Sequence, residues 1–249
     1  MTPNAVSRGH GSQRDVFACC GLTRTEAAED TLKAILELAG QGENVGTTRL
    51  AQVLDVTPPT SSAMVKRLVA HGLVQRGPGR ALSLTSHGLM HAQQIVRRSR
   101  LLETFLVRFL GMPWDEVAAE AELLEHAVSD RLLVRIDSAL RHPTRDPHGD
   151  PIPQSETSHQ EGWGHRLADA PTGTHFQVER IQHRDAAALR YLATLGVRPG
   201  VTLEVVDRSP FGGPLWVLVD GRAHALGGQL AELVHGAMMS PAACQAGSH

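Results

Sequence analysis

Apolar residues recur with a helical period at the start of the ordered part of the chain, from residue 25 to about residue 39. The polar stretch GQGEN then ends the pattern. This segment predicts an amphipathic helix whose buried face is formed by Ala28, Leu32, Ile35, Leu36 and Ala39.

The next forty residues predict two short helices followed by a β-hairpin. A helix with Leu50 and Leu54 closes at Asp55, and Thr57 can cap a further helix whose first turn holds two prolines. The segment LVQRGPGRALSLT then alternates around a Gly-Pro-Gly turn, which is typical of a hairpin. Helix, helix and hairpin in this order indicate a winged helix-turn-helix, whose second helix can enter the major groove of DNA.

Two long helices are predicted to follow. The first covers residues 86–110 and has an unusually apolar second half, LLETFLVRFLG, which favours packing in a dimer core. The second opens at Pro113-Trp114-Asp115 and runs to about Leu140, before the prolines of RDPHGDPIP stop it. Its expected apolar face consists of Val117, Ala121, Leu124, Val128 and Leu132.

The pattern then changes from helical to strand-like. Residues 151–172 are rich in Pro, Gly and Ser and are expected to form a tether. Residues 173–236 contain the strand-like segments FQVERI, VTLEVVDR and LWVLVDG and predict a small β-barrel. The expected fold class is mainly α with a small β part. Its parts are a tail that we expect to be disordered (1–22), a winged-helix domain (23–85), a helical dimerisation domain (86–150), the tether, the barrel and a tail (237–249).

Charge is distributed unevenly along the chain. The net charge is -2, but residues 1–100 hold 12 Lys+Arg and 7 Asp+Glu, and the remainder holds 12 and 19. A cationic first part suits contact with phosphates, and an acidic second part suits a bound cation or a solvated surface. Three cysteines, Cys19, Cys20 and Cys244, are too few for a disulfide framework. With no apolar signal core and no apolar run of roughly 20 residues, we expect a cytoplasmic protein without a membrane segment.

The predicted second helix of the winged domain carries the expected DNA contacts. Its short hydroxyl side chains, Thr57, Thr60, Ser61 and Ser62, allow a close approach to bases, and Pro59 can touch a thymine methyl. Lys66, Arg67, Arg76 and Arg80 can meet phosphates. A module for protein interaction is the alternative to DNA binding. The expected DNA-contacting residues are Thr47, Arg49, Thr57, Pro59, Thr60, Ser62, Lys66, Arg67 and Arg80.

One cluster in the second long helix suggests a cation site. Glu122, Glu125 and His126 follow the spacing i, i+3, i+4 and share one face. Two close carboxylates repel each other unless a proton or cation lies between them, and an imidazole completes a mixed site for a divalent ion. A solvated surface cluster is the alternative.

The chain resembles the diphtheria-toxin-repressor family of metal-dependent transcriptional repressors, especially its manganese-responsive branch. The segments LLETFLVRFLG, WDEV, AEAELLEHAVSDRL and RDPHGDPIP carry the resemblance. It implies a homodimer of winged-helix, helical and SH3-like domains that binds double-stranded operator DNA. It also implies a regulatory metal site at Asp30, Glu122, Glu125 and His126.

The ligand types indicate which metal ion binds, and several departures from the family pattern affect the second metal site. In the iron-responsive branch, Met and Cys stand at the positions of Asp30 and Glu122, so oxygen at both positions favours Mn²⁺ over Fe²⁺ or other divalent ions. Ser99, Ala118 and Arg180 replace family metal ligands, and Lys33 replaces a glutamate. A second site is still open to Glu103 with His183.

We therefore expect a repressor that controls metal-ion uptake and uses Mn²⁺ as its cofactor, and not an enzyme. The alternatives are an iron-responsive regulator of the same family, a metal-independent winged-helix regulator, and a metal hydrolase using Glu122, Glu125 and His126.

Overall fold

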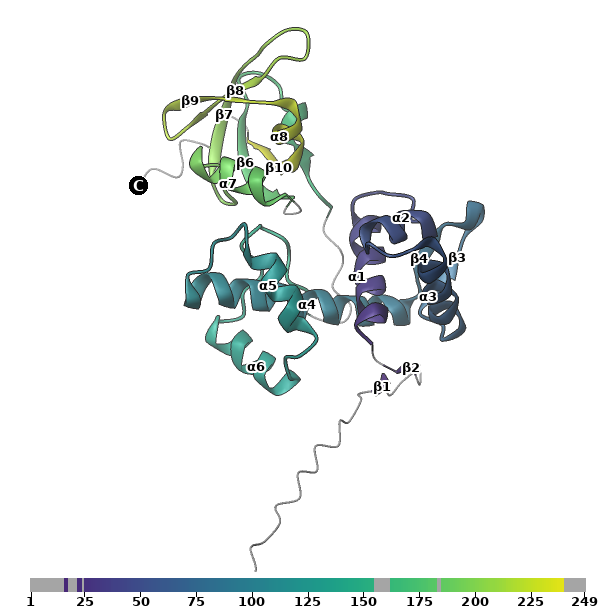
Figure 1. Cartoon of the computed structure of the whole chain (residues 1–249). Coiled ribbons are helices and arrows are strands. Elements are labelled where there is room, and N and C mark those ends of the chain that lie inside the picture. The colour runs from purple at the N-terminus through teal and green to yellow at the C-terminus, as the bar shows by residue number, and fades with distance from the viewer. Residues whose placement is uncertain (1–15, 18–21, 24, 155–161, 183–184, 240–249) are drawn as a thin grey trace, which may run out of the picture. The chain divides into compact units, whose positions relative to one another are not determined.

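The computed structural model describes residues 16–17, 22–23, 25–154, 162–182 and 185–239 (Figure 1). The chain forms two compact units, which we call the N-terminal unit (Met1–Leu36 and Asn44–Leu89) and the C-terminal unit (Glu37–Glu43 and Met90–His249). The three cysteines and most of both expected tails lie outside the described residues. Along the part of the chain that is described, no helix combines the length and the apolar character needed to cross a membrane.

The N-terminal unit is a winged helix, as the sequence predicts. Thr57 caps α3, whose first two positions are prolines, by accepting from the backbone of Thr60. The strands β3 and β4 pair antiparallel to form the wing, with Val74 opposite Leu84. The elements are β1 (Val16–Phe17), β2 (Leu22–Thr23), α1 (Glu26–Gly40), α2 (Thr47–Val53), α3 (Pro58–Ala70), β3 (Val74–Arg76), η1 (Pro78–Arg80) and β4 (Leu82–Leu84).

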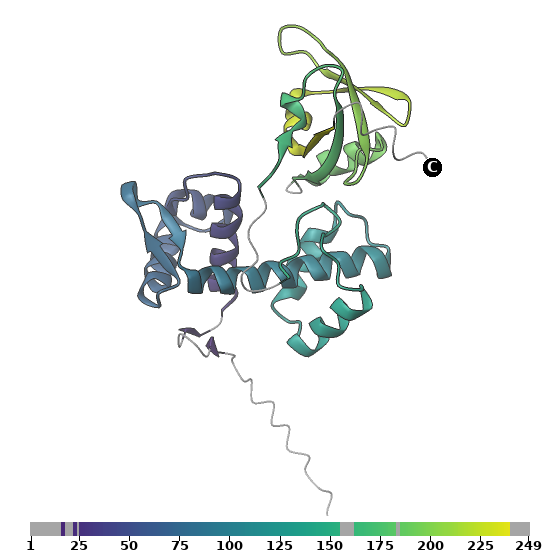
Figure 2. The same cartoon turned by 180° about the vertical axis from the view of Figure 1, so that it is seen from behind.

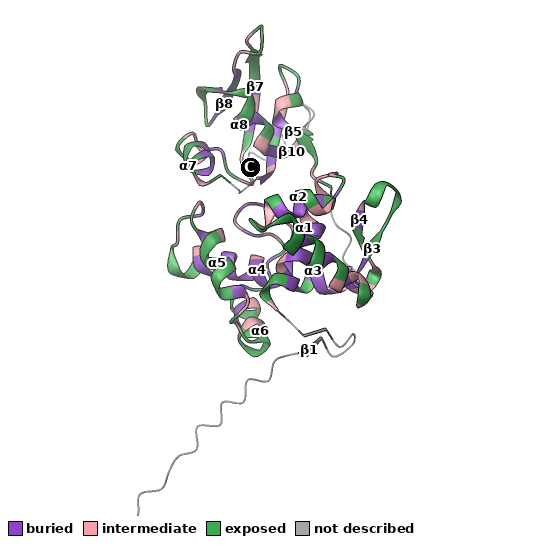
Figure 3. Cartoon of the chain, turned by 45° about the vertical axis from the view of Figure 1, so that its right-hand side comes forward, coloured by how far each residue is buried: buried purple, intermediate pink, exposed green. Residues whose placement is uncertain are grey.

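The buried face of α1 differs in part from the predicted one. Ala28, Leu32, Ile35 and Leu36 are buried, but Ala39 is exposed and Leu38 is buried instead. Figure 3 shows that buried residues (purple) and exposed ones (green) both occur along the helices of this unit.

The helical part of the C-terminal unit contains a break that the sequence did not predict. The first long helix is α4 (Ser86–Leu110), as expected (Figure 2). The second is two helices, α5 (Val117–Glu125) and α6 (Asp130–Ala139). The prediction of one helix to Leu140 is wrong because the Ser129 hydroxyl accepts from the Leu132 backbone and starts a new helix.

The apolar face predicted for this segment is only partly buried. Val117 and Ala121 pack in the core as predicted, whereas Leu124 and Leu132 are 37% and 50% exposed. Leu132 lies in α6, beyond the end of α5, whereas Leu124 is an exposed residue of α5 itself. The buried members of this core are Leu101, Leu102, Leu106, Val117, Ala121, Ile136, Leu140 and Ile152.

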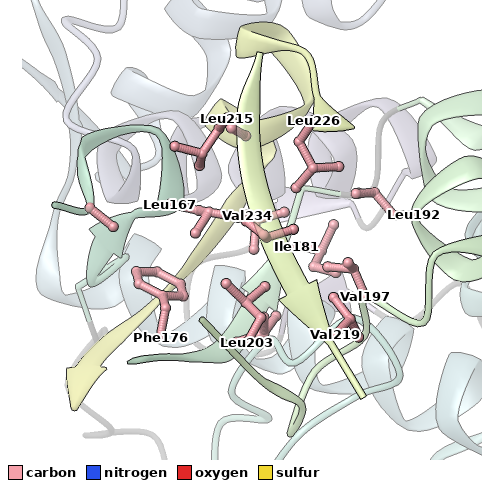
Figure 4. Close-up of a cluster of buried hydrophobic side chains, with 14 of the residues drawn as sticks. Leu167, Phe176, Ile181, Leu192, Val197, Leu203, Leu215, Val219, Leu226 and Val234 are labelled. Atoms are coloured by element: carbon pink, nitrogen blue, oxygen red, sulfur yellow. The ribbon is translucent and has the colours of Figure 1, made fainter. Parts of the chain in front are cut away.

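The rest of the C-terminal unit is an antiparallel sheet in the order β5-β10-β6-β7-β8-β9, twice the three strands predicted, and it has the expected SH3-like character. Apolar residues from its strands and from α7 meet in one core, which Figure 4 shows around Phe176 and Val234. Leu167, inside the range expected as a tether, is fully buried in this core. The elements are β5 (His165–Arg166), η2 (Leu167–Asp169), β6 (His175–Ile181), α7 (Ala186–Thr194), β7 (Thr202–Arg208), β8 (Leu215–Val219), β9 (Arg222–Leu226), α8 (Gly228–Leu233) and β10 (Val234–Met239).

Candidate metal centres and DNA-binding helix

Three buried side chains of the C-terminal unit converge on one point. Glu103 comes from α4, and Asp146 and His148 come from the loop after α6. Each offers one ligand atom, and these atoms all lie within 4.8 Å of one another. Their exposed fractions are 5%, 7% and 0%. We call this group the buried centre.

Backbone amides of the loop 146–150 hold one oxygen of the Asp146 carboxylate and leave the other without a hydrogen bond. The Oδ1 atom accepts from the backbone amides of His148 at 2.8 Å and Asp150 at 2.9 Å. The Oδ2 atom accepts no hydrogen bond from any residue that the structure describes, although Arg100 Nε lies 3.6 Å from it. A buried acceptor without a donor is costly, and a cation at this point would satisfy it.

Hydrogen bonding also selects the tautomer of His148. Its Nε2 lies 2.7 Å from the Trp114 carbonyl oxygen, which can only accept, so Nε2 carries the hydrogen. In the neutral ring Nδ1 is then the atom with the lone pair, and it lies 3.5 Å from Glu103 Oε2. A ring nitrogen whose partner nitrogen donates to a carbonyl is the usual arrangement of a metal-binding histidine.

Electrostatics at the buried centre favour a bound cation. Burial raises the pKa of Asp146 to about 7, reinforced by the carboxylates of Asp150 and Glu103 and opposed by Arg100 and His148. The guanidinium of Arg100 lies 3.6 Å from Asp146 and 3.7 Å from Asp150. Although burial works against it, these carboxylates raise the pKa of Arg100. Two carboxylates and an imidazole form an O,O,N set that fits a divalent ion such as Mn²⁺, Fe²⁺ or Zn²⁺.

The residues nominated from the sequence for the regulatory site fall in both units. In the C-terminal unit, Glu125 is 1% exposed and lies 3.7 Å from the Nε2 atom of His126, while Glu122 is exposed on α5. In the N-terminal unit, Asp30 is partly buried on α1. The structure therefore brings Glu125 and His126 together and places Glu122 on the surface of its helix.

The second site nominated from the sequence is partly described. Glu103 lies in the buried centre, but His183 lies outside the described residues. Asp146 and His148 were missed because RDPHGDPIP was interpreted as a helix breaker and as part of the family resemblance, and not as a source of metal ligands. Its Asp-x-His spacing, which can present two ligands from one loop, was the signal that could have found them.

The exposed side chains of α3 agree with a DNA-facing helix, with one correction. Pro59, Ser62 and Lys66 are exposed, whereas Ser61 is buried and donates to the Thr47 carbonyl at 3.0 Å. Ser61 therefore joins α2 to α3 and does not contact DNA. Of the other nominated residues, Thr57, Thr60, Arg76 and Arg80 are exposed, and Thr47, Arg49 and Arg67 are partly buried.

Family models match almost the whole described chain. Residues 24–82 match the N-terminal DNA-binding domain of iron-dependent repressors. Residues 85–154 match their metal-binding and dimerisation domain. Residues 165–237 match the FeoA domain.

Individual relatives are similar along most of their length. The iron-dependent repressor IdeR of Mycobacterium leprae is 31% identical over 206 residues, which cover 78% of this chain and 89% of that protein. The diphtheria toxin repressor of Corynebacterium efficiens is 29% identical over 216 residues, which cover 81% and 94%.

Solved structures of manganese regulators have the same fold. A manganese-dependent transcriptional repressor in complex with manganese superposes with a TM-score of 0.80 and 40% identity, covering 85% of this chain and 100% of that one. The manganese regulator SloR superposes with a TM-score of 0.71 and 30% identity, covering 85% and 98%.

Proposed function

The chain belongs to the iron-dependent repressor (diphtheria-toxin-repressor) family, and from that premise we propose that it is a manganese-responsive repressor of metal-uptake genes in the cytoplasm. Members of this family are metal-dependent transcriptional repressors, so the metal-hydrolase alternative is set aside. Mn²⁺ is the specific part of the proposal, because the relatives include both iron and manganese regulators.

The ligand atoms of the buried centre support the proposal of a hard metal ion. Its donors are two carboxylate oxygens and one imidazole nitrogen, none of them sulfur. Carboxylate oxygens suit Mn²⁺, while thiolate and thioether ligands select softer ions. The pair Glu125 and His126 repeats this chemistry at a second place in the same unit.

We propose that a second ion acts as the regulatory ion and uses Asp30, Glu122, Glu125 and His126. Asp30 belongs to the N-terminal unit and the other three to the C-terminal unit. An ion bound by residues of both units favours conformations in which the units are held together, and DNA selects among these conformations. In a homodimer this sets the separation of the two α3 helices, which must match half-sites about 34–36 Å apart.

The test measures DNA binding with and without metal. Operator sequences are first selected from random duplexes in the presence of Mn²⁺, and the dissociation constant is then measured with Mn²⁺, with Fe²⁺ under anaerobic conditions, and with chelator. We expect Mn²⁺ to tighten binding about 5–150-fold, the range of a coupling of about 1–3 kcal/mol. The variant Glu125→Gln should lose this response.

Glu120→Gln is the matched control, because Glu120 is an exposed glutamate on the same helix. It should respond to Mn²⁺ as the unaltered protein does. Equal affinity with metal and with chelator would instead identify a metal-independent regulator. A larger response to Fe²⁺ than to Mn²⁺ would identify an iron-responsive one, which the similarity to IdeR favours.

A further inference from the structure

The loop that carries Asp146 and His148 is attached to the C-terminal sheet. The Ile181 amide on β6 donates to the His148 carbonyl at 2.9 Å. Gly149, with a φ of +86°, lies so close to β6 that a Cβ atom there would overlap the Glu179 carbonyl oxygen. The backbone of this loop is therefore shaped against residues 179–181.

A buried ion pair makes the same connection through side chains. Arg180, which is 5% exposed, donates through Nε and Nη2 to Asp150 Oδ1, with the Nε distance 2.9 Å. Its guanidinium also lies 3.9 Å from the ring centroid of Trp163. The Asp150 amide in turn donates to Asp146 Oδ1.

These contacts form a continuous path from the sheet to a donor atom of the buried centre. Arg180 orients Asp150, the Asp150 amide fixes Asp146 Oδ1, and Asp146 Oδ2 is left as the oxygen of this carboxylate that accepts no hydrogen bond. A guanidinium has no acceptor atom, so Arg180 itself cannot coordinate a metal.

We propose that Arg180 and the adjoining backbone of β6 are positioning elements of the buried centre, so that docking of the C-terminal sheet against the loop sets the metal affinity of that centre. The inference rests on the proposed function, because it requires this centre to bind Mn²⁺. In this proposal the sheet affects metal binding although it supplies no ligand to the ion. By reciprocity, metal bound at the centre stabilises the contact between loop and sheet.

Gly149→Ala tests the backbone contact while leaving every donor and charge in place. Calorimetric titration of the full chain with Mn²⁺ should show affinity for one ion reduced about 10–100-fold, as for other groups that orient ligands. Gly221→Ala is the control, because Gly221 also has a positive φ (+76°) but nothing lies within 4 Å of an added Cβ. It should bind Mn²⁺ as the unaltered chain does.

Arg180→Gln tests the ion pair, because a purely electrostatic effect and a loss of positioning would change the Mn²⁺ affinity in opposite directions. Removing a nearby positive charge would tighten cation binding, whereas loss of positioning weakens it. We expect weaker Mn²⁺ binding, and Arg180→Gln combined with Asp150→Asn should be no weaker than Arg180→Gln. Unchanged or tighter binding in Arg180→Gln overturns the proposal. This variant also decides the matter if Gly149→Ala does not fold.

Hydrogen exchange of the Ile181 amide provides a readout independent of affinity. Mn²⁺ should slow this exchange in the unaltered chain. It should leave the exchange unchanged in Glu103→Gln, because this variant lacks the Glu103 carboxylate of the buried centre. If Glu103→Gln leaves the Mn²⁺ titration unaltered, the assignment of the buried centre as a metal-binding site is wrong. If Glu103→Gln removes one ion but Gly149→Ala and Arg180→Gln both bind normally, only the positioning role is wrong, and metal-dependent DNA binding is unaffected by that result.

Discussion

At the scale of single residues, Asp146 shows how burial prepares a side chain for a cation. Its carboxylate is held by two backbone amides on one oxygen and lies near Glu103 and Asp150. A buried group in this position either takes up a proton or binds a positive ion. The cost of the charged form in the metal-free protein is therefore offset when metal binds.

Asp146→Asn should remove metal binding at the buried centre and stabilise the metal-free protein. Because the pKa of Asp146 is raised to about 7, the folded state holds a proton that the unfolded chain has lost above about pH 4, and stability falls as pH rises through that window. We expect Asn to raise the melting temperature by about 2–4 °C at pH 8, equivalent to about 1 kcal/mol, and by less at pH 6.

Thermal melting of both proteins in chelator, at the two pH values, measures this difference. With Mn²⁺ added, the unaltered protein should gain more stability than the variant, which keeps only the proposed regulatory site. A variant that melts lower than the unaltered protein at pH 8 would contradict the idea that the Asp146 charge is costly.

At the scale of elements, α3 and α6 show how a capping side chain determines which residues the following helix exposes. Thr57 starts α3 and uses its hydroxyl locally, since it lies 2.8 Å from the Thr60 hydroxyl. Ser129 starts α6, so Leu132 belongs to a new helix and is 50% exposed instead of sharing the face of Val117 and Ala121. In both cases one short side chain decides the direction of the residues that follow.

Lys66→Ala should weaken DNA binding without changing the response to metal. Lys66 is exposed on α3, the helix that we expect in the major groove, and a lysine there would meet a phosphate. Affinity measured against salt concentration should fall for all duplexes alike, with the slope reduced by about one. Arg135→Ala, which alters an exposed residue of α6, should leave affinity and slope unchanged. A loss confined to one operator sequence would show that Lys66 contacts a base.

At the scale of the whole molecule, the exposed apolar residues of the helical part indicate the dimer surface. Leu123 on α5 is 74% exposed and Val134 on α6 is 65% exposed. Phe109 and Leu110 at the end of α4 are 56% and 65% exposed. The matched family model describes this segment as a dimerisation domain, so these side chains are expected to be covered by a second copy.

Leu123→Glu should shift the protein from dimer to monomer and weaken operator binding, because a buried unpaired charge opposes the interface. Light scattering after size-exclusion chromatography measures the mass against the 26.8 kDa of one chain. Phe211→Glu is the control, since Phe211 is fully exposed in the turn between β7 and β8 of the sheet. It should remain dimeric, and a dimeric Leu123→Glu would place the interface elsewhere.

The amino-acid sequence alone determined the features that depend on neighbouring residues. The bounds of α4, the cap of α3 at Thr57 and the hairpin around the Gly-Pro-Gly turn followed from periodicity, capping and turn chemistry. The proximity of Glu125 to His126 followed in the same way, because the two residues are adjacent in the sequence.

Tertiary structure decided what depends on distant residues. Glu103 and His148 are far apart in sequence and meet because α4 packs beneath the loop that follows α6. The burial of Arg180 against Asp150, and the tautomer of His148 set by the Trp114 carbonyl, also arise from long-range packing. Local patterns state which side chains share a face, but only the folded chain brings separate faces together and removes the water between them.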